Sequence, residues 1–367
     1  MPERHLEENN LLCTAQNGFR NVGKRNCPDH LYTLIETLKN RKRRKQRTLG
    51  FFLDFSKAFD MTNHSLVEFK LRKKGVKGKM LRTIRSLMAG MNAIATEQGK
   101  QSEPFKLQRG TAQGCPLSPT LFDVFIDDLV EKLHKNKKGI NEVSVLAYAD
   151  DILTLAATPE ELQEQVNICA EWTANWRMKA NAKKSQVMAW DVPAGPKTEL
   201  NITLNGTALK QVECYEYLGI KVDTELKFKA HEIGKLHGAK AKLGAIKQLI
   251  RENYVPRKMK QQLVNSVVLQ GPYYGLPFWG DDKPKVLDKL IKEPCKVIAG
   301  VNNKFRANPY AAMAIAGIKP ANVQLLETTT RMLGCIRNHD PGRLSKQTYQ
   351  RDCRNDTLKT NFDQSLE

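Results

Sequence analysis

The sequence predicts an α+β fold that is followed by a mostly helical region. From Leu49 to about Asp223, short apolar runs suited to strands alternate irregularly with helical segments, which is typical of an α+β chain. Beyond Leu226, apolar residues recur at helical spacing. A chain of 367 residues is also long enough for about two or three substructures with sizeable cores.

Each expected element rests on an apolar run or on residues that begin a helix. Leu49 to Phe55 suits a central strand, and Ser118-Pro119 is a natural start for a helix. Val143 to Leu155 reads as two apolar strands interrupted only by Asp150 and Asp151, which predicts a hairpin with both acidic residues at its turn. The other expected elements are helices at 64–74, 78–89 and 159–178 and strands at 185–190, 200–204 and 215–222.

The helical region begins with an apolar stripe that we expect to be core. Its residues are Ile233, Leu236, Leu243, Ile246 and Ile250. Lysines flank the stripe, among them Lys240 and Lys247, which suits contact with a duplex, although solvated lysines are the commoner outcome. The tail at 339–367 is polar with few aromatics, so we expect disorder there.

The charge balance indicates a polyanionic partner. The chain has 59 Lys and Arg against 39 Asp and Glu, a net charge of +20. A basic run at 39–47, which includes Arg43 and Arg44, suits backbone phosphates, a nuclear import signal or simply a solvated loop. No apolar run reaches the roughly 20 residues of a membrane span. The start of the chain lacks a secretory signal, so we expect an intracellular protein, in the nucleus or the cytoplasm.

Three carboxylates are the strongest candidates for chemistry. Asp54 stands in an otherwise apolar strand, where it needs a cation, and a salt bridge would serve as well as a metal ion. Two further acidic pairs, Asp127-Asp128 and Asp281-Asp282, lack apolar strands on both sides, unlike Asp150 and Asp151. If the strand of Asp54 pairs beside the hairpin, the oxygens suit two Mg²⁺ or Mn²⁺ ions about 4 Å apart.

Between the acidic strands lies RGTAQGCPLSPTLF, residues 109–122. Gly110 and Gly114 permit a close backbone approach to a ligand, and Gln113 offers an amide to a sugar or a base. Taken alone, the segment is equally typical of a glycine loop that caps a helix. Its position between the carboxylates favours a binding role.

FFLDFSKAFD, QGCPLSPTLF and AYADD, in this order, resemble motifs A, B and C of reverse transcriptases, most closely those of non-long-terminal-repeat (LINE-type) retrotransposons. QNGFR at 16–20 resembles a fingers segment of that family, and Asn181 to Ser185 resembles its motif D. The resemblance implies a right-hand polymerase palm with partial fingers and a thumb-like helical region. It also implies an RNA template, a DNA primer and deoxynucleoside triphosphates as partners, with no membrane and no clear protein partner.

The resemblance implies a role for each matching residue. Asp54, Asp150 and Asp151 would bind the metal ions, Phe59 would be the steric gate against ribonucleotides, and Lys184 would be the general acid, with Lys183 as a competitor. Three further groups would bind the nucleotide, grip the primer or contact nucleic acid: Gln113 and Gly114; Tyr217, Leu218 and Gly219; and Arg20, Arg43, Arg44, Lys240 and Lys247.

The resemblance also predicts a division of the chain. Residues 1–48 would be partial fingers with a basic loop, 49–225 the palm, 226–338 the thumb region and 339–367 the tail. Because family members carry more fingers sequence before QNGFR, we expect a chain truncated at its N-terminus. Three alternatives stay open: an inactive remnant that only binds RNA or DNA, an RNA-templated RNA polymerase, and a maturase of the group II intron type.

Overall fold

The structure is a computed structural model that describes residues 2–20, 24–112, 114–136, 143–192, 195–280, 284–301 and 308–354. The chain forms two compact units. The first comprises Met1–Glu213 with Pro341–Thr348, and the second comprises Cys214–Asp340 with Tyr349–Glu367. Among the described residues, no helix combines the length and the apolar character that a membrane crossing requires.

The first unit is built around a five-stranded sheet of order β11-β8-β1-β7-β6. Its pairs are antiparallel except β11 with β8. The strands are β1 Thr48–Leu53, β6 Val145–Tyr148, β7 Asp151–Ala156, β8 Gln186–Trp190 and β11 Lys210–Gln211. All six residues of β1 are buried, which confirms the central strand expected from its apolar run.

The register of the sheet corrects one detail of the expected hairpin. Tyr148 at the end of β6 pairs with Asp151, so the two-residue turn consists of Ala149 and Asp150. Asp151 is therefore the first residue of β7 and not part of the turn. A two-residue connection is the commonest link between antiparallel strands, because its twist matches that of the strands.

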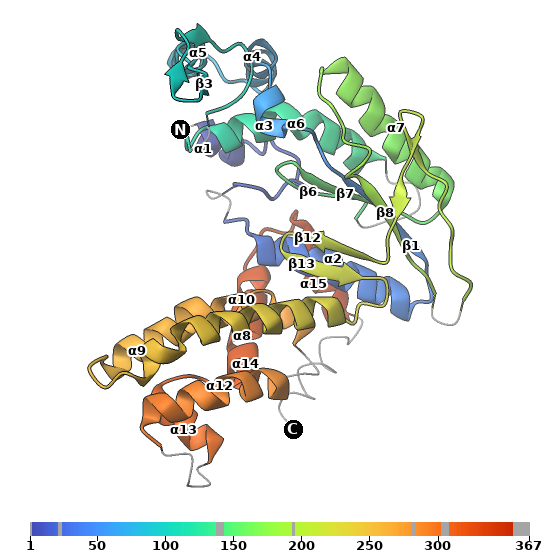
Figure 1. Ribbon diagram of the computed structural model, residues 1–367. Coiled ribbons are helices and arrows are strands. Elements are labelled where there is room, and N and C mark those ends of the chain that lie inside the picture. The colour runs from blue at the N-terminus through green and yellow to red at the C-terminus, as the bar shows by residue number, and fades with distance from the viewer. Residues whose placement is uncertain are drawn as a thin grey trace. The chain divides into compact units, whose positions relative to one another are not determined.

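Helices cover both faces of this sheet (Figure 1). α6 (Ser118–Lys135) and α7 (Pro159–Asn175) pack against each other over one face, and α2 (Cys27–Arg43) lies on the other. α7 begins with a capping box, in which the Thr158 side chain accepts from the Glu161 N–H and the Glu161 carboxylate accepts from the Thr158 N–H. Because apolar layers lie on both sides, the strands read as continuous apolar runs.

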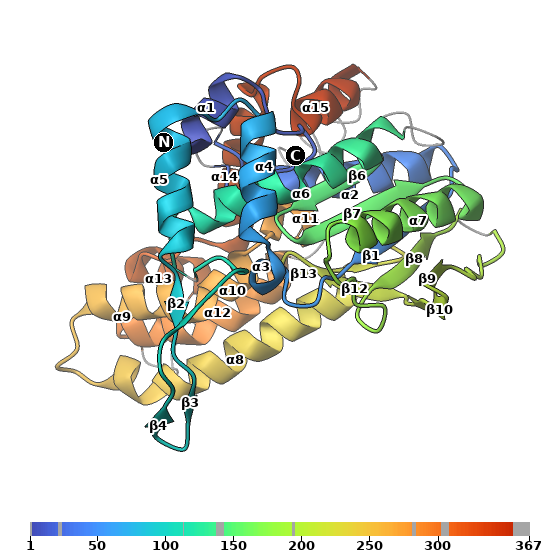
Figure 2. The ribbon, with the colours of Figure 1, turned by 90° about the horizontal axis from the view of Figure 1, so that it is seen from above.

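Smaller elements complete the first unit. α4 and α5 lie side by side (Figure 2), within the ranges that the sequence predicts. The short helices are α1 Pro2–Glu8, α3 Ala58–Met61, α4 His64–Lys73 and α5 Gly78–Ala89. The two-residue strands are β2 Asn92–Ala93, β3 Thr96–Glu97, β4 Lys100–Gln101, β5 Phe105–Lys106, β9 Thr203–Leu204 and β10 Thr207–Ala208.

The second unit consists of one hairpin and a helical core. The hairpin pairs β12 (Cys214–Tyr217) with β13 (Ile220–Asp223). The helices are α8 Lys229–Arg251, α9 Arg257–Leu263, η1 Val264–Leu269, α10 Gln270–Tyr273, α11 Leu276–Trp279, α12 Pro284–Ala299, α13 Pro309–Ala316 and α14 Ala321–Arg337. Val264, Val268, Ile291 and Cys295 lie at the centre of their core, each at most 1% exposed.

Two expectations about the helical region need correction. Ile233 is 67% exposed, so the apolar stripe of α8 is core only from Leu236 onward, where its side chains pack against the helical core. The tail is helical at α15 (Leu344–Arg354), where Leu344, Ser345 and Thr348 are buried, so the expected disorder is wrong there. Packing supplies the stabilisation that the polar composition did not predict.

The basic run at 39–47 is not a loop throughout, because α2 extends to Arg43. Of the two further acidic pairs, Asp127-Asp128 is helical in α6 as expected, and Asp281-Asp282 lies outside the described residues. The two-unit division falls between Glu213 and Cys214. Tyr217, Leu218 and Gly219 therefore belong to the second unit and not to the unit that holds the sheet.

Candidate active site

The pairing of β1 with β7 brings the three candidate carboxylates to one end of the sheet. Leu53 pairs with Ile152, and Asp54 directly follows Leu53 while Asp151 directly precedes Ile152. Asp54 and Asp151 therefore continue the same register just beyond the paired strands. Asp150 stands beside them in the turn of the hairpin. Residues separated by about a hundred positions in the chain thus meet through strand pairing.

The main chain of Asp54 is anchored on both sides by the segment that resembles motif D. The Asp54 N–H donates to Ser185 Oγ at 3.1 Å, and the Asn181 N–H donates to the Asp54 carbonyl at 2.8 Å. Ser185 is fully buried, so its hydroxyl has a single well-defined environment. The Asp54 carboxylate is half-buried, and its Oδ2 is buried without a hydrogen-bond partner.

The three carboxylates lie close together without a positive charge beside them among the described residues. Burial raises the pKa of Asp150, and the nearby Asp54 raises it further. Burial, then the charges of Asp150 and Asp54, raise the pKa of Asp151 to about 6. No Lys, Arg or His in the part of the chain that the structure describes forms an ion pair with any of the three. A cation placed here would reverse each of these pKa shifts.

The donor set fits a divalent cation, although it is not a closed metal cage. Within the described ranges, no three His, Cys, Asp or Glu side chains are grouped so that they alone could hold a metal ion. Mg²⁺ in nucleotide-binding sites is held by one or two carboxylates, with substrate phosphates and waters completing its shell. The partnerless Oδ2 of Asp54 and the mutual repulsion of three carboxylates fit such an open site.

The glycine loop after β5 is bonded to the end of the segment that carries Asp54. The Gly110 N–H donates to the Thr62 carbonyl at 2.8 Å, and the Thr111 N–H donates to the Phe59 carbonyl at 3.1 Å. Gly110 has φ +91°, and a Cβ there would lie 3.3 Å from the Asp60 carbonyl oxygen. The positive φ therefore favours glycine at Gly110, and a Cβ would also force the Asp60 backbone to shift by a few tenths of an ångström.

Phe59 lies on this loop side of the site. Its ring is half-buried and stacks on Phe122 of α6, with centroids 4.6 Å apart and planes inclined by 28°. Two aromatic rings in an offset stack fix each other's orientation.

Gly114 is exposed with φ +84° and has no atom within 4 Å of the position of a Cβ. Gln113 lies outside the described residues, so its expected role stays a prediction.

Lys183 and Lys184 are both exposed at the end of the segment that anchors Asp54. The Lys184 N–H donates to the Asn181 carbonyl at 3.1 Å, which closes the turn that also presents Ser185. Their side chains make no ion pair within the described ranges. Geometry therefore does not separate the two lysines, and Lys184 as general acid stays a prediction.

The expected primer-grip residues form the tight turn of the second unit's hairpin. Tyr217 pairs with Ile220, so Leu218 and Gly219 make a two-residue turn with φ +47° and +75°. Tyr274 supports this turn, because its hydroxyl donates to the Leu218 carbonyl at 2.7 Å and its ring lies 3.3 Å from the position of a Gly219 Cβ. Tyr217 is 2% exposed, so its side chain serves the core of this unit.

Arg20 corrects the expected set of nucleic-acid contacts. It is 3% exposed, and its guanidinium donates to both carboxylate oxygens of Glu7 and to the carbonyls of Cys13 and Gln16. These bonds use four of its five N–H groups, and because the side chain is buried it is not accessible to a phosphate. Arg20 is therefore structural, and it anchors the QNGFR segment from within.

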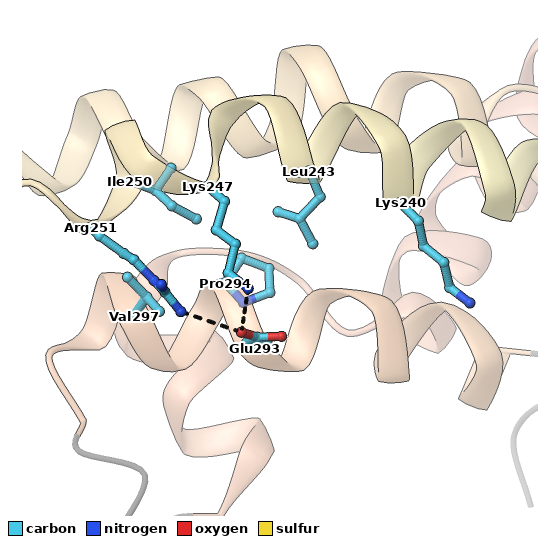
Figure 3. Close-up of a pocket in the computed structure, with 9 residues that line it drawn as sticks. Lys240, Leu243, Lys247, Ile250, Arg251, Glu293, Pro294 and Val297 are labelled. Carbon is cyan, nitrogen blue, oxygen red and sulfur yellow. Dashed lines mark ion pairs between the residues drawn. The ribbon is translucent and has the colours of Figure 1, made fainter.

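The other expected basic contacts are solvent-exposed. Arg43 and Arg44 lie at the end of α2, and Lys240 and Lys247 lie on α8. A cavity of about 170 Å³ is lined by residues of α8 and α12, among them Lys240, Leu243 and Val297. Figure 3 shows these lining residues. Lys247 and Arg251 both approach the Glu293 carboxylate there, at 3.7 and 3.8 Å. Lys247 is thus partly neutralised, whereas no ion pair engages Lys240 among the described residues.

Sequence reasoning overlooked two residues that touch the acidic hairpin. Gln16 and Gly18, both within QNGFR, contact the turn at Ala149. The signal was present in the sequence as a polar pair followed by glycine, a combination typical of a segment in close backbone contact. Nothing local indicated which part of the chain it contacts.

Comparisons with known proteins agree with this architecture. The family model described as "Reverse transcriptase (RNA-dependent DNA polymerase)" matches residues 3–222. An RNA-directed DNA polymerase from mobile element jockey of Drosophila funebris is 25% identical over 287 residues, which cover 75% of this chain and 30% of that protein. A retrovirus-related Pol polyprotein from the type-1 retrotransposable element R2 of Popillia japonica is 27% identical over 281 residues, covering 72% and 37%. The chain thus spans about a third of the length of these relatives.

Among solved structures, a telomerase from Candida albicans in complex with a telomeric RNA fragment has a similar fold, with a TM-score of 0.51 at 12% identity. The match covers 92% of this chain and 54% of that one. At this identity the likeness concerns the mixed α+β fold alone. The match to residues 3–222 includes the sheet, the three carboxylates and the glycine loop. The chain belongs to the reverse transcriptase (RNA-dependent DNA polymerase) family and is related to the reverse transcriptases of non-long-terminal-repeat retrotransposons.

Proposed function

We propose that this chain carries the polymerase active site of a retrotransposon and extends a DNA primer along an RNA template with deoxynucleoside triphosphates. The observation that carries the proposal is the register of β1 with β7, which sets Asp54 beside the hairpin of Asp150 and Asp151. Three carboxylates without a cationic partner among the described residues are costly in a structure unless a ligand compensates them. Membership of the reverse transcriptase family supports the same chemistry.

Asp54, Asp150 and Asp151 would hold two Mg²⁺ or Mn²⁺ ions. When bound, such ions lower the pKa of a primer 3′-hydroxyl and stabilise charge on the departing pyrophosphate. The chain's own part is to orient the carboxylates, and the bonds from Asn181 and to Ser185 do this for Asp54. Lys184, exposed at the end of that same segment, is our candidate for giving a proton to the pyrophosphate.

Selection of the sugar would fall to Phe59. Its ring is held in one orientation by the stack on Phe122, and a half-buried ring presents a rigid surface to a sugar. A rigid surface against C2′ excludes a hydroxyl group by steric overlap. This assignment favours an RNA-directed DNA polymerase over an RNA-templated RNA polymerase. Gly114, with open space around its α-carbon, would let the nucleotide approach the backbone.

Nucleic acid would bind through exposed cations in both units. Arg43 and Arg44 on the first unit and Lys240 on the second are solvent-exposed, as contacts with backbone phosphates require. Lys247 shares Glu293 with Arg251, so we expect a smaller contribution from it than from Lys240. Tyr217, Leu218 and Gly219 would support the primer strand with a turn stiffened by Tyr274.

The experiment is primer extension by the purified chain with an RNA template, a DNA primer, Mg²⁺ and either deoxynucleotides or ribonucleotides. We expect deoxynucleotide incorporation that requires the template and that Asp54→Asn abolishes. Phe59→Ala should relax the preference for deoxynucleotides by about 10- to 100-fold, the range that one steric contact can supply. Salt-sensitive binding of RNA without extension under Mg²⁺ or Mn²⁺ would instead assign the chain a binding function only.

A further inference from the structure

The segment that contains Gln16 runs alongside the acidic hairpin as an additional strand-like neighbour of β6. The Ala147 N–H donates to the Ala15 carbonyl at 3.0 Å, and the Asn17 N–H donates to the Ala147 carbonyl at 2.8 Å. Gln16 and Ala147 form an isolated parallel bridge. The hairpin is therefore held from two sides, by β1 next to β7 and by this segment next to β6.

The Gln16 side chain grips the residue that precedes Asp150. It is fully buried, and its Oε1 accepts from the Ala149 N–H at 2.9 Å and from the Gly18 N–H at 2.8 Å. Its Nε2 donates to the Ala149 carbonyl at 3.4 Å. One amide thus bonds to both backbone polar groups of Ala149 and to its own segment.

Ala149 needs such support because its backbone is in the left-handed region, with φ +53°. An L-residue with a Cβ is disfavoured there, and it persists only where the surroundings over-determine it. Gly18 contributes by its lack of a side chain, since a Cβ would overlap the Ala149 nitrogen and lie 2.9 Å from the Tyr148 carbonyl carbon. The segment therefore contacts the turn through the side chain of Gln16 and through the backbone of Gly18.

The QNGFR segment is itself rigidly held, which lets it act as a fixed reference for the turn. Arg20 donates to the Gln16 carbonyl at 2.9 Å, and Arg25 donates to the Thr14 carbonyl and to Asn17 Oδ1, each at 2.8 Å. Asn17 Nδ2 lies 3.0 Å from Nδ1 of His30 on α2. Several hydrogen bonds that converge on one segment in this way favour a single arrangement of it.

We propose that Gln16 is a positioning residue of the candidate active site, which holds Ala149 in its left-handed conformation and so directs the carboxylates of Asp150 and Asp151 toward Asp54. The expected effect on metal binding rests on the proposed function, because the orientation of the carboxylates matters for activity only if they hold metal ions. The hydrogen bonds of Gln16 to Ala149, which we call the clamp, concern only the conformation of the turn. The two are therefore tested by separate measurements.

The clamp is tested by amide hydrogen exchange of Ala149 in Gln16→Met, a change that keeps the side-chain length and removes the acceptor. The Ala149 signal in the ¹⁵N-alanine spectrum is assigned by its absence from Ala149→Gly. We expect exchange to become at least about tenfold faster, as loss of one buried hydrogen bond allows. The matched control is Gln165→Met, because Gln165 is equally buried and donates to the Leu155 carbonyl at 3.1 Å, at the other end of β7.

The consequence is tested by the Mg²⁺ concentration that gives half-maximal primer extension. We expect Gln16→Met to raise it about tenfold, the lower end of what residues behind metal ligands contribute, and Gln165→Met to leave it unchanged. The double variant Gln16→Met/Ala149→Gly should recover part of this loss, because glycine adopts the left-handed conformation without the clamp. Gly18→Ala should behave like Gln16→Met.

Three results discriminate among the explanations. Equal Ala149 exchange in the wild type and in Gln16→Met overturns the clamp, whatever the activity. Faster exchange with an unchanged Mg²⁺ requirement overturns the positioning role and leaves Gln16 as a structural residue. Absence of extension by the wild type counts against the polymerase proposal, and the exchange measurement then still decides the clamp.

Discussion

Two acidic pairs in the first unit, Asp127-Asp128 and Asp150-Asp151, differ in whether lysines neutralise them. In α6, Asp127 pairs with Lys74 at 2.5 Å and accepts from the Cys13 N–H at 2.7 Å, while Asp128 pairs with Lys70 at 2.7 Å and accepts from Trp172 at 2.9 Å. Asp150 and Asp151 have no cationic partner among the described residues and face a third carboxylate instead. One pair is neutralised by the fold, and the other is left charged.

The difference teaches which acidic pair is available for chemistry. A carboxylate that is already paired would lose its partner on binding a metal ion, whereas an unneutralised cluster gains from the same event. The adjacent acidic residues are identical in type, so their composition does not distinguish them. Whether a pair can accept an added cation depends on whether lysines of α4 and its C-cap already reach it, as Lys70 and Lys74 reach Asp128 and Asp127.

The largest expected effect separates the two pairs by activity. Asp150→Asn should lower primer extension by roughly 10³-fold, because metal ions contribute several kcal/mol to such reactions. Asp127→Asn should keep the rate per folded molecule within about twofold, since among the described residues its polar partners are Lys74 and the Cys13 N–H, neither of which belongs to the candidate site. Extension rates normalised to active-site titration check this. Equal losses in the two variants would erase the distinction.

The next effect concerns stability and should appear only at the neutralised pair. Lys74→Met leaves the Asp127 carboxylate, which is 2% exposed, without its cation, and should lower the free energy of unfolding by about 3 kcal/mol. Urea denaturation measures this change. The double variant Lys74→Met/Asp127→Leu should recover most of the loss, because a well-packed apolar pair replaces both charges. No recovery would mean that the lysine stabilises the protein through other contacts.

A smaller effect of opposite sign is expected at the unneutralised cluster. Since the folded-state pKa of Asp151 is raised from 3.8 to about 6, the folded state binds protons more tightly, and stability falls as pH rises between about 4 and 6. At pH 7.5 without metal, Asp151→Asn should therefore raise Tm by about 2–4 °C, because water reaches the partly exposed side chain and screens the effect to about 1 kcal/mol. Calorimetry measures the Tm of both proteins at pH 7.5, where we expect the variant to be more stable, and at pH 4, where we expect the difference to disappear.

Added Mg²⁺ provides the internal control for that measurement. It should raise the Tm of the wild type at pH 7.5 and have little effect on Asp150→Asn, because a ligand that binds only the folded state stabilises it. Equal stabilisation of both proteins would place the ion elsewhere.

The smallest effect is a dependence on salt. Raising NaCl from about 0.05 to 0.5 M screens the repulsion among Asp54, Asp150 and Asp151, so the Tm difference between the wild type and Asp151→Asn should narrow by about 1 °C. Salt also changes the Tm of each protein through its overall charge of about +20, and this shared change cancels when the two Tm values are subtracted. A difference that widens with salt would indicate that repulsion is not the cause.

Much of the fold follows from local patterns. The apolar run before Asp54 predicts a buried strand, and the structure has β1 there with every residue buried. The helices at 64–73 and 78–89 and the start of α6 follow from apolar spacing and from Pro119. Local patterns misjudged Ile233 and residues 344–354, because exposure of one helical position and burial of a polar helix depend on the neighbours that pack against them.

The sequence by itself determined the family and singled out the three carboxylates as site candidates, since motif order and residue type are properties of the chain. Only the tertiary structure decided which acidic pair is neutralised, that Arg20 is buried against Glu7, and that Gln16 supports Ala149. The physical reason is that hydrogen bonds and ion pairs form between groups that are close in space. Gln16 and Ala149 are separated by 133 positions, and only the pairing of strands brings them together.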